Sequence, residues 1–386
     1  MDKPDDTPEI PPAPSAEQQA KEYEAAHNRL FVVRILLTLA ALAVYQLSGA
    51  SRTLAEGLHL RFGSAWYLVN GIYTLVTVFG FAALMFPLSL FTDFTLEHRY
   101  GLSKQGMVGW FLDFLKALAL ELILAVVFFE VIYALLRFAP HLWWAWATMF
   151  YVLFAVVLTS IAPVLIMPLF HKFEPLDNPT LGEAVKSFVE QAGLRVVGVF
   201  RWGLEEKTNT ANAALTGLGR TRRIILGDTM LTGYTTEEII AVLAHEVGHY
   251  KHRDILRLMA SGSILAAIGF YTAHLVLHVL IVTFGFQTAA DIATFPLFIF
   301  CLFVFSLITM PVANAYSRRR EYRADDYAVR SVGSASPLVG ALEKLANQNL
   351  ADRSPAAWIE FLLHSHPSIN RRIARARQVE GQTGAA

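Results

Sequence analysis

The sequence contains one cysteine and few charged residues. Cys301 is the only cysteine among 386 residues, which excludes a disulfide within the chain and a metal site made of several thiolates. Any bound metal must therefore use histidines and carboxylates. Charged residues make up 17% of the chain, 32 basic residues balance 32 acidic ones, and no basic run alternates with aromatic residues. We therefore expect no nucleic-acid partner.

The sequence contains several long hydrophobic runs. Hydrophobic residues make up 54% of the chain, which is typical of a membrane protein. A helix needs about 20 mainly apolar residues to cross the hydrocarbon core of a bilayer. Six runs are long enough: about 30–50, 65–91, 109–136, 142–168, 258–282 and 295–315. We therefore predict a multi-pass integral membrane protein whose spans contact the lipid bilayer.

Polar segments divide the chain into blocks. We expect a disordered polar tail (1–29), four spans (30–168) with a polar loop (92–107), a first soluble block (169–257), two spans (258–315), a second soluble block (316–378) and a short tail (379–386). The first tail is rich in proline, alanine and glutamate, and it lacks the basic region that opens a signal peptide. We expect the two soluble blocks to fold together as one domain.

The distribution of basic residues predicts the orientation in the membrane. With six crossings, both soluble blocks lie on the same side. The loops on the opposite side contain only Arg52, Arg61 and Arg137. Because lysine and arginine favour the cytoplasmic side, we expect the soluble blocks to be cytoplasmic. The membrane would be the inner membrane of a bacterium or the endoplasmic reticulum of a eukaryote.

The first soluble block is expected to contain a small sheet followed by a helix. Residues 195–202 and 223–226 have the β-branched content of short strands. Thr235 and Glu238 form a capping box, which marks the start of a helix. The apolar residues that follow keep a helical spacing, so the helix should continue past residue 245.

This helix carries the sequence His-Glu-Val-Gly-His. His245 and His249 are four residues apart, so both rings project from one helix face and can bind one ion. Glu246 lies beside them, where a carboxylate can take a proton from a metal-bound water. We predict a catalytic metal site, in preference to two surface histidines that merely share a helix face.

A third ligand must come from elsewhere in the chain. His252 lies about 10 Å from His245 along the helix axis, at 1.5 Å per residue, which is too far to bind the same ion. Position 255, where a more extended motif would place a histidine, is Ile255. The segment 317–325 supplies Glu321 as a ligand and Asp325, one turn later, to hold a ligating histidine ring. We favour this over a solvated helix face of arginine and carboxylate pairs.

Several motifs together resemble the type I CAAX prenyl endopeptidase family. The resemblance extends from about Glu97 to Ile373. It is carried by HEVGH (245–249), SRRREYRAD (317–325), Asn212-Ala213 before a strand, FHKFEPL (170–176) and His366-Pro367 followed by Arg372. The combination is specific even where single motifs are not.

The resemblance implies roles for individual residues. Glu321 would be the third zinc ligand, and Asp325 would support a ligating histidine. His366 and Arg372 would stabilise the oxyanion that forms at the scissile carbonyl. Asn212 and Ala213 would lie on an edge strand that pairs with the substrate backbone.

The resemblance also implies a fold and an activity. The fold would be mainly α: a barrel of membrane helices around a large chamber, with a gluzincin-like zinc-peptidase domain that carries a small β-sheet. Animal and fungal members have seven membrane helices, whereas six are expected here. The activity would be that of a zinc metalloendopeptidase with one Zn²⁺ per chain, which removes the C-terminal tripeptide of prenylated CAAX proteins or peptides.

Two alternatives remain open at this point. One is a heat-shock-type membrane protease that acts in protein quality control with the same motifs. The other, from a different class, is a transporter or lipid-binding chamber with a vestigial site, against which the intact set of ligands and acid argues. The sequence does not predict the oligomeric state.

Overall fold

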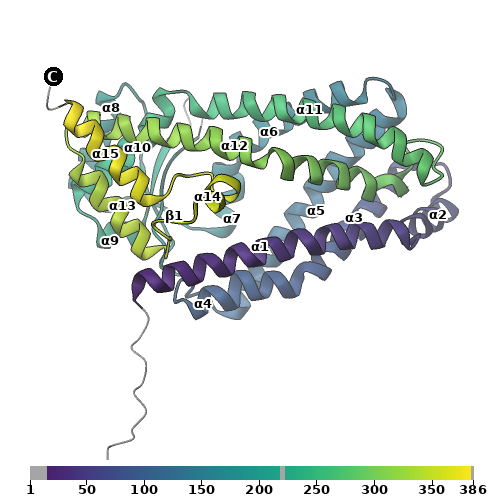
Figure 1. Ribbon diagram of the computed structural model, residues 1–386, viewed down its shortest axis with the longest axis horizontal. Helices are drawn as coiled ribbons and strands as arrows, with labels where there is room; N and C mark the ends of the chain where they lie inside the picture. Colours follow the sequence, from purple (N-terminus) through teal and green to yellow (C-terminus); the bar gives the residue numbers. More distant parts are fainter. Residues whose placement is uncertain (1–14, 218–221, 384–386) are drawn as a thin grey trace, which may run out of the picture.

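Six helices among the described residues are long and apolar enough to cross a membrane, which confirms the predicted number of spans. The computed structural model describes residues 15–217 and 222–383. The long helices extend along the long axis of the molecule, the sheet and most of the shorter helices gather at one end, and a short helix (Ala50–Phe62) lies at the other (Figure 1). The spanning helices are α1 (Ala16–Leu47), α3 (Trp66–Ser89), α5 (Met107–Phe138), α6 (Trp143–Ile161), α11 (Asp254–Thr283) and α12 (Phe295–Val332).

Two of these helices continue through π-helical turns toward the soluble end. The extensions of α3 are η1 (Leu90–Leu96) and α4 (Glu97–Arg99), and those of α6 are η2 (Ala162–Ile166) and α7 (Met167–Phe170). The prediction of a loop at 92–107 is therefore wrong for residues 92–99, which remain helical. Polarity had suggested a loop there, but the backbone stays hydrogen-bonded as a helix.

The buried hydrophobic core of the bundle lies at the end away from the sheet. Tyr73, Trp143 and Phe298 are fully buried there. The short α2 (Ala50–Phe62) joins this core through Ser51, whose Oγ donates to the Ala293 carbonyl at 2.8 Å. Beside this core, side chains of α1, α3, α5 and α12 line a cavity of about 430 Å³.

The soluble blocks form one domain around a four-stranded sheet. Its strands are β1 (Phe173–Pro175), β2 (Val199–Trp202), β3 (Ala213–Thr216) and β4 (Arg223–Gly227). Their order is β1-β2-β4-β3, with β2 parallel to β4 and the outer strands antiparallel to their neighbours. The two strands predicted from β-branched content are thus confirmed as β2 and β4, and β3 ends the sheet.

Helices surround the sheet and bring the site residues together. They are α8 (Pro179–Gln191), α9 (Asp228–Gly233), α10 (Thr236–Lys251), α13 (Ser336–Gln348), α14 (Ala357–Leu363) and α15 (Ile369–Thr383). The predicted capping box starts α10: the Thr235 hydroxyl accepts from the Glu238 N–H, and the Glu238 carboxylate accepts from the Thr235 N–H. Apolar residues of α8, α10 and the sheet form the core of this domain.

The predicted tails are shorter than expected. Helix α1 begins at Ala16, where the Ser15 hydroxyl accepts from the Gln18 N–H, so the disordered tail at 1–29 is wrong for residues 16–29. Local capping and contacts with distant elements order this segment despite its polarity. At the other end α15 reaches Thr383, so the tail at 379–386 is wrong for residues 379–383. Residues 1–14 and 384–386 lie outside the described residues.

Candidate active site

Helix α10 crosses α12 at close range, and a glycine permits this approach. A Cβ placed on Gly248 would lie 3.0 Å from the Cα of Ala324 and 3.2 Å from the Cβ of Tyr327. A larger residue at this position would push the two helices apart. The glycine between the two histidines therefore allows the motif to lie against the helix that carries Glu321.

The crossing brings His245, His249 and Glu321 together. Their ligand atoms all lie within 4.8 Å of one another. The Nε2 atoms of the two histidines are 3.1 Å apart. Glu321 Oε2 lies 3.4 Å from His245 Nε2, and Glu321 Oε1 lies 3.3 Å from His249 Nε2. Ligands about 2.0–2.1 Å from one tetrahedral ion are about 3.3 Å apart. Glu321 Oε2 is buried without a hydrogen-bond partner, so the three side chains fit a metal ion.

Asp325 holds the ring of His245 from behind. Its Oδ1 lies 2.8 Å from His245 Nδ1, and Arg372 donates to both of its oxygens at 2.7 and 2.9 Å. The Asp325 side chain is fully buried. Burial opposes the charge of Arg372, but the Asp325 carboxylate raises the pKa of Arg372 above its ordinary value. Burial likewise opposes protonation of His245, but hydrogen bonds to Asp325 and Glu321 raise the pKa of His245 to about 9.

A second carboxylate holds His249, and the sequence did not reveal it. Asp254 Oδ2 lies 3.1 Å from His249 Nδ1, and its other oxygen lies 3.8 Å from Arg320 Nη1. The turn between α10 and α11 places it there through Arg253, whose φ of 54° is unusual for a residue with a side chain. Because Asp254 follows this turn, helical spacing from the histidines could not place it.

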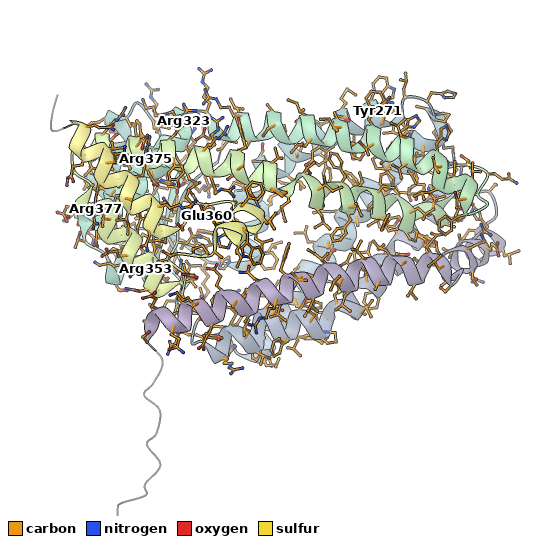
Figure 2. The ribbon with its side chains drawn as sticks, viewed as in Figure 1. Tyr271, Arg323, Arg353, Glu360, Arg375 and Arg377 are labelled. Carbon is orange, nitrogen blue, oxygen red and sulfur yellow. The ribbon has the colours of Figure 1, made fainter. Side chains whose placement is uncertain are left out.

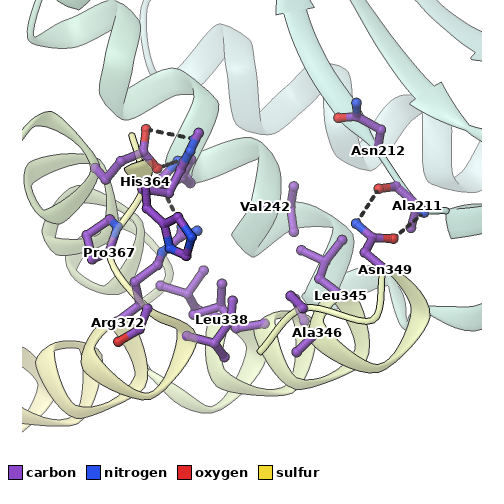
Figure 3. Close-up of a pocket in the computed structure, with 18 of the residues that line it drawn as sticks. Ala211, Asn212, Val242, Leu338, Leu345, Ala346, Asn349, His364, Pro367 and Arg372 are labelled. Atoms are coloured by element: carbon purple, nitrogen blue, oxygen red, sulfur yellow. Dashed lines mark hydrogen bonds and ion pairs between the residues drawn. The ribbon is translucent and has the colours of Figure 1, made fainter. Parts of the chain in front are cut away.

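A cavity of about 600 Å³ opens beside His245 and Glu321 (Figure 3). Glu246 lines it, as do Asn212 and Ala213 at the outer strand β3. The remaining wall is mostly apolar and includes Met230, Val242, Leu338, Leu342 and Leu345. The cavity therefore combines the metal-ligand set with an open strand edge and an apolar wall.

The two residues expected at the oxyanion occupy different surroundings. His366 lies at the cavity with its side chain 63% exposed, and its Nε2 is 3.5 Å from Glu321 Oε1. Arg372 also reaches the cavity, but its guanidinium already binds Asp325. The other ring nitrogen of His366, Nδ1, lies 3.0 Å from the Ser365 hydroxyl. The oxyanion role of Arg372 stays a prediction, and its observed partner is a carboxylate.

Comparison with known protein families covers nearly the whole chain. Residues 175–380 match the model of peptidase family M48. The chain belongs to this family. Residues 13–172 of this M48 peptidase match a second model, described as the CAAX prenyl protease N-terminal domain with five membrane helices. The described residues of that segment contain four spanning helices and the shorter α2.

Relatives of this M48 peptidase occur in bacteria and eukaryotes. It is 28% identical to the uncharacterized metalloprotease YhfN of Bacillus subtilis, over 95% of this chain and 87% of that one. It is 30% identical to CAAX prenyl protease 1 of Saccharomyces cerevisiae, over 79% of this chain and 70% of the yeast protein. The crystal structure of S. mikatae Ste24p matches with a TM-score of 0.85 at 22% identity, over 96% and 91% of the two chains. The protein is therefore a membrane metalloprotease, and the predicted fold class is confirmed.

Proposed function

We propose that this M48 peptidase is a zinc-dependent endopeptidase that cuts a peptide bound as an added strand along β3. One observation carries the proposal: His245, His249 and Glu321 converge beside Glu246 in a cavity whose wall includes the open edge of the sheet. An extended peptide can pair with such an edge and place a carbonyl next to the metal ligands.

Each residue of the site has a separate role in the proposed peptide hydrolysis. Zinc held by the three ligands would lower the pKa of a water and polarise the scissile carbonyl. Glu246 takes the proton of the attacking water and passes it to the leaving amine. His366 donates a hydrogen bond to the carbonyl oxygen as it gains charge. Asp325 and Asp254 keep the two ligating rings in the correct orientation.

We further propose that the substrate is a prenylated protein C-terminus from which the last three residues are removed. The motif resemblance supports this, as does the similarity to a yeast protein named CAAX prenyl protease 1. We place the soluble domain in the cytoplasm, because basic residues gather on it. Arg353, Arg375 and Arg377 lie at the soluble end of the molecule (Figure 2).

The test is Glu246→Gln in purified enzyme with prenylated and unprenylated peptides. The variant should bind zinc as tightly as the wild type, because Glu246 is not a proposed ligand, and kcat should fall by about 10²–10⁴-fold. Metal content and mass-spectrometric cleavage maps are the readouts. Wild-type turnover by the variant would refute the mechanism. Equal cleavage of both peptide classes by the wild type would favour the quality-control alternative.

A further inference from the structure

The outer edge of β3 offers its backbone groups at alternate residues. The Gly227 N–H donates to the Asn212 carbonyl at 2.8 Å, so the groups of Asn212 face β4. In an antiparallel pair the direction of these groups alternates along the strand. The backbone groups of Ala211, Ala213 and Leu215 therefore face the open edge, where a substrate strand would pair.

One of these three positions already has a partner. Asn349 accepts from the Ala211 N–H through Oδ1 at 2.9 Å and donates to the Ala211 carbonyl through Nδ2 at 3.3 Å (Figure 3). Its amide thus makes the two hydrogen bonds that a residue of a neighbouring strand would make. A peptide can pair with Ala213 and Leu215, but not with Ala211 while Asn349 is in place.

The backbone holds Asn349 in this position. It caps the C-terminal end of α13, and the next residue, Leu350, has a φ of 48°. That left-handed position is usually occupied by glycine. The Ala351 N–H donates to the Ala346 carbonyl at 2.9 Å and closes the turn. A non-glycine residue in this conformation is strained, and such strain is common where a side chain must be held for function.

Asn349 and Ala211 line the same cavity as His245 and Glu246. We propose that Asn349 sets the substrate register: it ends the strand-pairing edge at Ala211 and so limits how many residues extend past the scissile bond on that side. This inference rests on the proposed function, because it assumes that the substrate pairs with β3. It makes the site selective for peptides with a short segment at one end, such as a chain terminus.

The test is a series of peptides lengthened one residue at a time on either side of the scissile bond. In the wild type, lengthening the peptide on one side of the scissile bond should stop raising kcat/KM once the peptide reaches Ala211, where Asn349 blocks pairing. Asn349→Ala frees the Ala211 N–H and carbonyl, so longer peptides on that side should gain about tenfold in kcat/KM, mostly through KM. Asn349→Asp, which keeps the acceptor but loses the donor, should give a smaller gain.

Gln348→Ala is the matched control. The Gln348 amide also anchors this turn, by donating to the Asn209 carbonyl at 2.7 Å, but Asn209 lies before the pairing edge. The control should keep the wild-type length profile. The proposal is overturned if folded Asn349→Ala keeps that profile, or if Gln348→Ala shifts it equally through a loosened turn. If the wild type cleaves none of the peptides, the proposed function itself fails.

Discussion

At the scale of residues, each histidine of the candidate metal site has its own carboxylate. Asp325 lies behind His245 and Asp254 behind His249, and both carboxylates are buried. A carboxylate in this position fixes the ring tautomer and orientation, and makes the free nitrogen a better ligand. The two carboxylates come from different helices, α12 and α11. The candidate metal site therefore depends on three helices: α10 carries the two histidines, and α11 and α12 carry the carboxylates that hold them.

We predict that Asp254→Ala weakens zinc binding by about 10–100-fold, because His249 loses the group that orients it. Competition with a chelator of known affinity measures this effect. Asp326→Ala is the control. Asp326 is on the same helix as Glu321 but is not one of the three candidate ligands, and its carboxylate instead pairs with Arg375 at 2.8 Å. Wild-type zinc affinity in folded Asp254→Ala would contradict a supporting role.

The sequence revealed those residues whose spacing follows a regular helix. His245, Glu246 and His249 could be placed because four residues make about one turn of a helix. Asp254 and Asn349 could not, because each lies next to a residue with positive φ, Arg253 or Leu350. These are the only non-glycine residues with positive φ in the described chain, and sequence periodicity does not extend across such turns.

At the scale of elements, the distance between α10 and α12 decides whether the ligands converge. We predict that Gly248→Ala moves the helices apart, because a Cβ there would lie 3.0 Å from the Ala324 backbone. The expected result is a lower unfolding temperature and weaker zinc binding, by about tenfold. Backbone atoms cannot move aside as a flexible side chain can.

Gly262→Ala on α11 is the control for this substitution. A Cβ at Gly262 would have no atom within 4 Å, so alanine should be neutral or slightly stabilising through its better helix propensity. Thermal unfolding in detergent and chelator competition compare the two variants. Equal effects of both substitutions would show that the close crossing does not control the site.

The elements themselves were predictable to different degrees. The six spans and the start of α10 follow from apolar runs and a capping box, which are local signals. The helical segment 16–29 was missed because its polar composition suggests disorder. It is ordered by distant partners: the Tyr23 hydroxyl donates to Glu97 at 2.7 Å, and Glu24 contacts the loop after α13.

At the scale of the whole molecule, the first membrane helix reaches the catalytic cavity. Glu24 accepts from the Asp352 N–H at 3.0 Å and lies 3.3 Å from His364 Nε2, and it lines the cavity itself. Asp352 and His364 belong to the segment that leads to His366. A residue of α1 thus fixes the loop that bears a proposed oxyanion donor.

We predict that Glu24→Ala lowers kcat/KM by about tenfold, because the free energy lost with one hydrogen bond to a charged group corresponds to a factor of about that size. The reason is a looser loop around His366, so the loss should appear in kcat more than in zinc affinity. Glu17→Ala, which removes an exposed pair with Lys21 on the same helix, should leave kcat/KM unchanged. Unchanged kinetics of Glu24→Ala would rule out this coupling.

Helix α12 continues from the membrane span past Pro311 to Glu321 of the candidate metal site. Glu321 lies 26 residues after the first residue of the helix, Phe295. At 1.5 Å per residue the two are about 39 Å apart, so a tilt of about 5° at the far end moves Glu321 by about 3 Å. Spanning helices tilt to match the thickness of the bilayer. We therefore expect that a change in bilayer thickness that tilts α12 would also displace Glu321 relative to the membrane surface.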